Sequence, residues 1–164
     1  MTDWRQNLVD DDAGLLAILR EAKTVAVLGA KPGGAEPAYY VPAYLRERGY
    51  RILPVNPKIA GRELLEAHAV ARLADLAEAA DVVEIFRRPE HLPAHAVEIL
   101  ALPWRPKAVW FQLGIRHDAA AERLARAGIR VVQDRCMMPE HRRLMAVRAA
   151  GRRGAGAPPS EASQ

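Results

Sequence analysis

Five short runs of β-branched and other apolar residues recur along the chain. They cover residues 24–30, 51–55, 81–86, 107–113 and 129–133, and each is typical of a strand. Successive runs start 22 to 30 residues apart, which is too far for a hairpin and leaves room for a helix between two turns. The pattern predicts an α/β protein with a Rossmann-like, open, mainly parallel five-stranded sheet and helices on both faces.

Apolar residues at helical spacing fill the segments between these runs. Helices are predicted for 37–48, 90–102 and 118–127, with a leading helix at 12–21 and a last helix at 138–148. Gly49 and Gly128 follow two of these segments, and a glycine there favours a left-handed helix end. Residues 62–80 are compatible with one long helix or with two short helices that meet at a bend near His68, and we favour the broken form.

Length and composition fit one globular domain. The chain has 164 residues, of which 50% are hydrophobic and 27% are charged, so it can bury a core without disulfides or a structural metal. We expect this domain at residues 1–149. The stretch 150–164 is rich in Gly, Pro and Ser and has no apolar period, so we expect a disordered tail there.

Several features favour a cytoplasmic protein with a small-molecule ligand. No apolar stretch approaches the ~20 residues of a membrane helix, and the acidic N-terminus does not resemble a secretory signal. The lone Cys136 cannot form an internal disulfide, which fits a reducing compartment. The formal net charge of +4 is too mild and too dispersed to argue for nucleic acid, and we expect none as a partner. We expect no membrane partner, and the sequence indicates no particular protein partner.

Basic and small residues follow the predicted strands, and ligands of an open parallel sheet bind at the carboxyl ends of its strands. A glycine-rich turn at 29–34 precedes a helix, where backbone N–H groups can hold a phosphate. Lys31, Lys58, Arg87 and Arg88 follow three different strands and would converge on a phosphate-rich ligand, of which coenzyme A is one. The same residues are also compatible with a plain tight turn and solvated strand ends.

Two common nucleotide sites are disfavoured. The turn lacks the G-x-G-x-x-G spacing, and the second strand ends in Asn56-Pro57-Lys58 rather than in the acidic residue that binds the ribose of NAD. The turn is also not a Walker A loop, because no G-K-[ST] closes it. A nucleotide with additional phosphate remains compatible with these residues.

An ordered set of motifs resembles a known family. The motifs are Val27-Leu28-Gly29-Ala30, Tyr40-Val41 with Tyr44-Leu45, Gly49-Tyr50-Arg51-Ile52-Leu53-Pro54-Val55-Asn56-Pro57, Asp81-Val82-Val83 with Phe86-Arg87-Arg88, Val109-Trp110-Phe111-Gln112-Leu113-Gly114-Ile115, and Asp134-Arg135-Cys136-Met137 with Glu140-His141. From about Leu15 to Leu144 the chain is similar to the small bacterial and archaeal CoA-binding-domain proteins, the YccU-like family. The resemblance implies a Rossmann-like domain similar to that of the succinyl-CoA synthetase α-subunit and of ADP-forming acyl-CoA synthetases.

The resemblance also implies a set of coenzyme A contacts. They are Gly29, Ala30 and Lys31 in the phosphate turn, Tyr40 and Val41 at the start of the next helix, Asn56, Pro57 and Lys58 after the second strand, Phe86 and Arg87 after the third, and Gln112, Leu113 and Gly114 on the pantetheine side. Many relatives have a serine or asparagine in the first turn, so Lys31 or the backbone would replace that contact here. The histidine that the synthetases phosphorylate lies in a second domain with no counterpart in this sequence.

The candidate catalytic groups are few. Cys136, with Glu140 and His141 nearby, could suggest a nucleophile, but a small buried residue is the more usual role and no oxyanion site is recognisable. A further hypothesis is a mixed disulfide between Cys136 and coenzyme A under oxidation. His91 and His95 lack a third metal ligand, so we expect no metal site.

We therefore expect a protein that binds coenzyme A or an acyl-CoA without catalysis, as a sensor or carrier. The alternative is a CoA-dependent enzyme or subunit whose partner chain supplies the catalytic groups.

Overall fold

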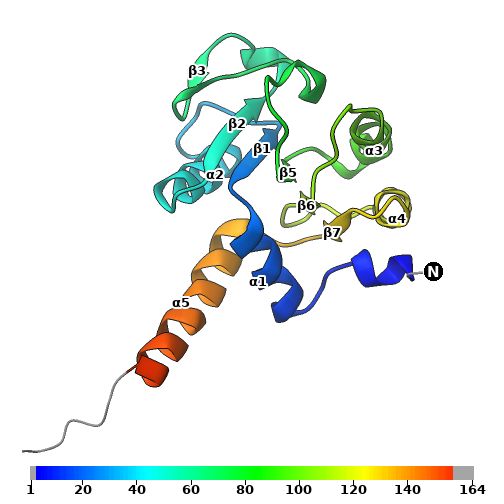
Figure 1. Cartoon of the computed structure of the whole chain (residues 1–164). Coiled ribbons are helices and arrows are strands. Elements are labelled where there is room, and N and C mark those ends of the chain that lie inside the picture. The colour runs from blue at the N-terminus through cyan, green and yellow to red at the C-terminus, as the bar shows by residue number, and fades with distance from the viewer. Residues whose placement is uncertain (1–2, 157–164) are drawn as a thin grey trace, which may run out of the picture.

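The computed structural model describes the backbone of residues 3–156 and the side chains of residues 3–146. Its centre is one sheet of five parallel strands in the order β2-β1-β5-β6-β7 (Figure 1). The strands are β1 (Thr24–Leu28), β2 (Arg51–Val55), β5 (Val82–Ile85), β6 (Ala108–Phe111) and β7 (Arg130–Val132). Each lies within one of the five apolar runs, so the predicted Rossmann-like α/β fold is confirmed.

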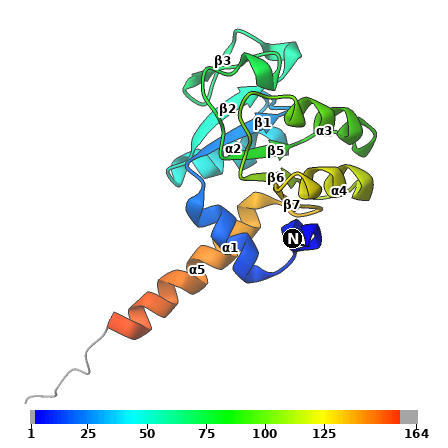
Figure 2. The same ribbon diagram turned by 45° about the vertical axis from the view of Figure 1, so that its right-hand side comes forward.

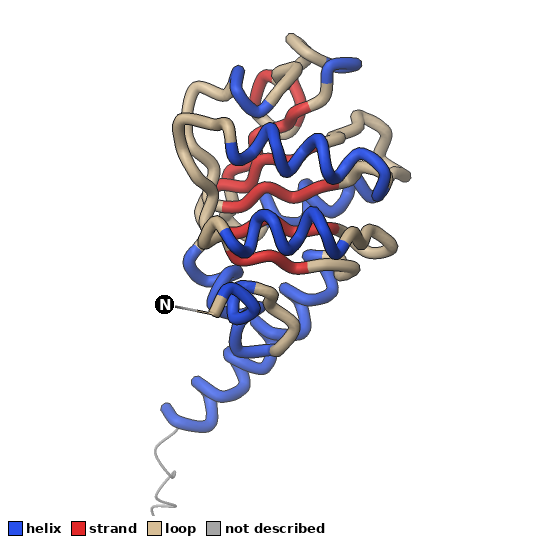
Figure 3. The backbone as a smooth tube through the Cα atoms, turned by 90° about the vertical axis from the view of Figure 1, so that its right-hand side faces the viewer, coloured by secondary structure: helices blue, strands red, loops and turns tan. Residues whose placement is uncertain are grey.

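Helices cover both faces of this sheet (Figure 3). On one face, α1 (Asp12–Glu21), α2 (Pro37–Glu47) and the start of α5 (Met137–Gly156) enclose a core that includes Val27 and Trp110. On the other face, α3 (Leu92–Leu100) and α4 (Asp118–Arg126) pack over Val83 and Phe111, with the short 3-10 helix η1 (Trp4–Asn7) against α4. Trp110 and Phe111 are core residues, at 0% and 1% exposure.

Local sequence explains where several helices begin and end. The Asp11 side chain accepts a hydrogen bond from the Gly14 N–H (3.0 Å) at the start of α1, and His117 does the same for Ala120 (3.1 Å) at the start of α4. Gly49 and Gly128 adopt positive φ angles of 99° and 88° just past α2 and α4, as their positions predicted.

The prediction of a broken helix at 62–80 was wrong. Residues there form a two-stranded hairpin, β3 (Glu63–Leu64) and β4 (Ala67–His68), followed by the 3-10 helix η3 (Leu73–Asp75). Val70 extends the edge of the sheet beyond β2. Its N–H donates to the Pro54 carbonyl (3.1 Å), and its carbonyl accepts from the Asn56 N–H (2.9 Å). Backbone pairing with the edge strand β2 outweighs the helix propensity of this alanine-rich segment.

The last helix continues to Gly156, past its predicted end at residue 148, and its second half extends away from the sheet (Figure 2). The predicted boundary at 149 therefore falls within α5, and the rest of the predicted tail, 157–164, lies outside the described residues. No helix within residues 3–156 is long and apolar enough to cross a membrane.

The strand order determines where a ligand can bind. From β1 the chain moves outward to β2, and it then returns across the sheet to place β5 on the other side of β1. The connections after β1 and β5 therefore leave the sheet in opposite directions, which opens a crevice between their carboxyl ends. The turn after Leu28 and the segment after Ile85 border this crevice.

Candidate functional site

The glycine that begins the first turn is required by its surroundings. Gly29 has a φ of +93°, and its N–H donates to the Val55 carbonyl of β2 (2.8 Å). A Cβ at this position would lie 2.6 Å from the carbonyl oxygen of Phe86, which follows β5. Gly29 thus allows the backbone ends of β1, β2 and β5 to approach one another at the crevice.

We expect Gly29→Ala to destabilise the fold by at least about 2 kcal/mol, because it combines a left-handed backbone with a clash against a backbone carbonyl. Gly34→Ala in the same turn is the matched control, since a Cβ there would meet nothing within 4 Å. Chemical denaturation of both variants measures the difference. Equal loss of stability in the two would contradict the structural role given to Gly29.

Four basic residues meet at one pocket beside this turn. The pocket has a volume of about 590 Å³ and is lined by Gly29, Lys31, Pro32, Gly33, Glu36, Asn56, Lys58, Ile59, Phe86, Arg87, Arg88 and His91. Lys31 pairs with Glu36 (3.6 Å), whereas Lys58, Arg87 and Arg88 form no ion pair with any carboxylate among residues 3–146. The Nε of Arg87 is buried and has no hydrogen-bond partner in that part of the chain.

Asn56 holds the first two strand ends together beneath the pocket. Its side-chain N–H donates to the Ala30 carbonyl (2.9 Å), and its side-chain oxygen accepts from the Lys58 N–H (3.0 Å). An aspartate could accept the second of these bonds but, when ionised, could not donate the first. Asn56 stands where an NAD site has an acidic residue, and its amide positions Ala30 and Lys58 around the crevice.

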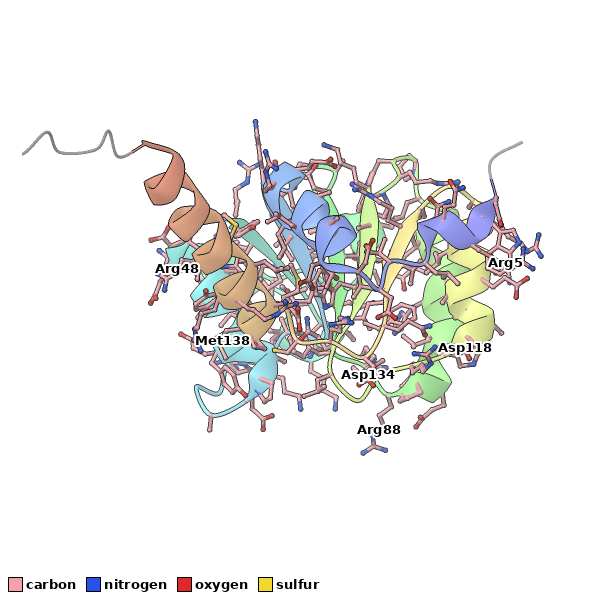
Figure 4. The ribbon with its side chains drawn as sticks, turned by 90° about the horizontal axis from the view of Figure 1, so that it is seen from below. Arg5, Arg48, Arg88, Asp118, Asp134 and Met138 are labelled. Atoms are coloured by element: carbon pink, nitrogen blue, oxygen red, sulfur yellow. The ribbon has the colours of Figure 1, made fainter. Side chains whose placement is uncertain are left out.

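A second pocket of about 450 Å³ continues from the first. It is lined by Lys31, Glu36, Pro37, Ala38, Tyr40, Phe86, Arg87, Arg88, Pro89, Gln112, Leu113, Gly114, Ile115 and Cys136, so the two pockets share Lys31, Glu36, Phe86, Arg87 and Arg88 in their common wall. Together they form what we call the groove, with a basic compartment at β1, β2 and β5 and a more apolar compartment toward β6. Figure 4 shows Arg88 and Asp134, which follow β5 and β7, on the same side of the sheet.

Most of the predicted contact residues line this groove. They are Gly29, Lys31, Tyr40, Asn56, Lys58, Phe86, Arg87, Gln112, Leu113, Gly114 and Cys136. Three others do not: Ala30 and Val41 are buried in the core at 1% and 0% exposure, and Pro57 is exposed at the start of a 3-10 helix. Glu36, Ile59, His91 and Ile115 line the groove without having been predicted.

Comparison with protein families identifies the chain. A family model described as the CoA binding domain matches residues 23–142, which include all five strands and every residue that lines the groove. The chain belongs to the CoA-binding domain family.

The chain is also similar to other proteins over most of its own length and of theirs. The protein YneT of Bacillus subtilis (strain 168) is 33% identical over 129 residues, which cover 79% of this chain and 93% of YneT. A solved structure from Thermus thermophilus, designated cell-free ID.343, is 53% identical with a TM-score of 0.78 and covers 82% of this chain and 99% of its own. A hypothetical protein from Pyrococcus horikoshii OT3 is 32% identical with a TM-score of 0.76, over 83% and 93% of the two chains.

This CoA-binding-domain protein also buries a carboxyl group next to its groove. Glu84 in β5 is 0% exposed and accepts a hydrogen bond from the side-chain N–H of Gln112 (2.9 Å), while its other oxygen has no partner among the described residues. Burial raises the pKa of Glu84 to about 8, so it is a neutral acid near pH 7. In the sequence, the only sign of this buried carboxyl group was one acidic residue within an apolar run.

Cys136 lines the apolar compartment but is not arranged as an activated nucleophile. Burial raises the pKa of its thiol, and the charges of Glu84 and Glu140 raise it further. A backbone hydrogen bond from Met138 lowers the pKa but does not cancel these effects. The Nδ1 of His141 shares a hydrogen bond with the Tyr44 hydroxyl (3.0 Å), and burial lowers the His141 pKa. The thiol thus stays protonated at neutral pH, and the mixed disulfide with coenzyme A remains a prediction.

His91, just before α3, and His95, within α3, have different surroundings. His95 pairs through Nδ1 with Glu98 (3.0 Å), and His91 lines the basic compartment of the groove. Among residues 3–146, no group of three or more His, Cys, Asp or Glu side chains could hold a metal ion.

Proposed function

We propose that this protein binds coenzyme A or an acyl-CoA in the groove, as a non-catalytic module that senses or carries its ligand. The observation that carries the proposal is the set of Lys58, Arg87 and Arg88 in one compartment without carboxylate partners among residues 3–146. Basic side chains gathered without counter-ions favour a multiply charged anion. Membership of the CoA-binding domain family supports coenzyme A as that anion.

The two compartments match the two halves of the proposed ligand. The phosphates would bind against the turn that starts at Gly29, with Lys58 and Arg87 as cationic partners. The uncharged pantetheine chain would run along Tyr40 and Leu113, whose exposed fractions of 39% and 71% are high for large hydrophobic side chains. Ligand would cover both side chains.

The start of α2 supplies a further favourable group for the phosphates. Its N-cap residue Glu36 makes no side-chain hydrogen bond to the first turn of the helix, and Pro37 and Ala38 line the groove. Pro37 has no N–H to donate, so the contribution comes from the Ala38 N–H and from the helix dipole, which favour an anion. Because Lys31 already pairs with Glu36, we assign the larger electrostatic role to Lys58 and Arg87.

Calorimetric titration with coenzyme A tests the proposal directly. We expect one site, weaker binding of 3′-dephospho-coenzyme A, and no comparable binding of NAD. Binding should weaken as salt is added, because the contacts to phosphate are screened. The absence of both heat and a thermal shift with coenzyme A would refute the proposal, and equally tight binding of NAD would also refute it. Copurification of a second chain that enables turnover of an acyl-CoA would favour the CoA-dependent enzyme instead.

A further inference from the structure

Glu84 occupies a position where a carboxyl group is unexpected. In the sheet it lies between Val27 of β1 and Trp110 of β6, on the face covered by α1, α2 and α5. Both neighbours are fully buried. A carboxyl group in such a position is unfavourable unless it is neutral and hydrogen-bonded, so its presence requires an explanation other than stability.

The only side chain that hydrogen-bonds Glu84 within the described part of the chain is a groove residue. Gln112 is 3% exposed, lines the apolar compartment beside Leu113 and Cys136, and donates one side-chain N–H to Glu84. A glutamine amide has a second N–H and an acceptor oxygen. These two groups are left for other partners.

The pairing with Glu84 also decides which way the amide is turned. An apolar residue at position 84 would leave the Gln112 amide free to rotate, and its N–H and oxygen would then exchange places. The Glu84 oxygen that accepts the bond keeps the nitrogen inward. The orientation matters for an amide-containing chain, whose N–H and carbonyl need partners of opposite kind.

We propose that Glu84 is a positioning residue that holds Gln112 in one orientation, and that Gln112 then binds an amide or thioester group of the ligand chain. The inference rests on the proposed function, because it assigns the pantetheine part of coenzyme A to this compartment. Glu84 acts through Gln112 and does not itself contact the ligand.

The test compares two ligands and four variants. Coenzyme A contains the pantetheine chain, whereas adenosine 3′-phosphate 5′-diphosphate keeps the charged half and lacks that chain. Glu84→Met and Gln112→Met should each lower the affinity for coenzyme A about tenfold, the effect of one well-placed hydrogen bond, and leave the affinity for the nucleotide unchanged. Glu84→Gln keeps an acceptor for Gln112 and should bind coenzyme A within about twofold of the wild type.

The double variant Glu84→Met/Gln112→Met decides whether the two residues act as a unit. We expect it to bind coenzyme A no more weakly than Gln112→Met alone, because Glu84 has no effect without Gln112. Additive losses would overturn the proposal, as would unchanged coenzyme A affinity in Gln112→Met or equal losses for the two ligands. If Glu84→Met does not fold, the Gln112→Met and Glu84→Gln results decide alone. A wild-type chain that binds neither ligand would instead refute the proposed function.

Discussion

At pH 9 the Glu84→Gln variant is expected to be several kcal/mol more stable than the wild-type protein. The pKa of Glu84 is raised from 4.5 to about 8 because the carboxyl is fully buried. A group with a raised folded pKa contributes its full stability below the unfolded pKa, and this contribution is lost as pH rises through the folded pKa. The shift corresponds to about 5 kcal/mol lost by pH 9, and a glutamine, which does not titrate, avoids that loss.

Urea denaturation at pH 5 and pH 9 measures this effect. At pH 5 we expect the variant to be slightly less stable than the wild type, by about 1 kcal/mol, because its amide N–H groups replace an oxygen that has no partner. Glu63→Gln, at an exposed position in β3, is the matched control and should change little at either pH. A stability difference between wild type and Glu84→Gln that is the same at both pH values would show that folding does not raise the pKa of Glu84.

The sheet could be predicted because both of its faces are buried, which leaves a simple pattern in the sequence. Strands of a parallel sheet covered by helices are continuous apolar runs, and the runs at 24–30 and 107–113 each contain the observed strand. The hairpin at 63–68 was not predictable in this way. Its strands have only two residues each, and the bonds that hold Val70 to Pro54 join segments whose pairing the local composition does not reveal.

The groove was predictable to the extent that it follows from topology. Once the strands are parallel, the residues after β1, β2 and β5 must meet, and Lys58 and Arg87 do line one pocket. The direction of each side chain could not be predicted from the topology. Val41 follows Tyr40 in the family motif, but adjacent residues of a helix point about 100° apart, so Tyr40 lines the groove while Val41 faces the core.

The residues that were not predicted from the sequence depend on tertiary contacts that local patterns do not show. Glu84 lies inside a strand rather than after it, so a search of strand ends could not find it, and its importance depends on Gln112 from the neighbouring strand. Glu36 and His91 enter the groove from the connections that lead into helices. The conformation of those connections is set by tertiary contacts more than by local pattern.

The basic compartment leads to the largest expected effect on ligand binding. Arg87 lies where the two compartments meet, is half-buried, and has a buried Nε without a partner among the described residues. A guanidinium in this setting gains more from an anion than an exposed cation does, because less water screens the interaction. Replacing it with a carboxylate removes that attraction and adds repulsion toward the phosphates.

We expect Arg87→Glu to weaken coenzyme A binding at least about 100-fold, since a charge-assisted hydrogen bond contributes about 1.5–3 kcal/mol and the reversed charge repels the ligand. Arg123→Glu on the exposed face of α4 makes the same change in net charge away from the groove and should bind coenzyme A normally. Titration calorimetry at two salt concentrations measures both variants, and the salt dependence of affinity should be smaller in Arg87→Glu. Equal weakening in the two variants would show that overall charge, rather than the groove, attracts the ligand. Unchanged binding in Arg87→Glu would place the phosphates elsewhere on the protein.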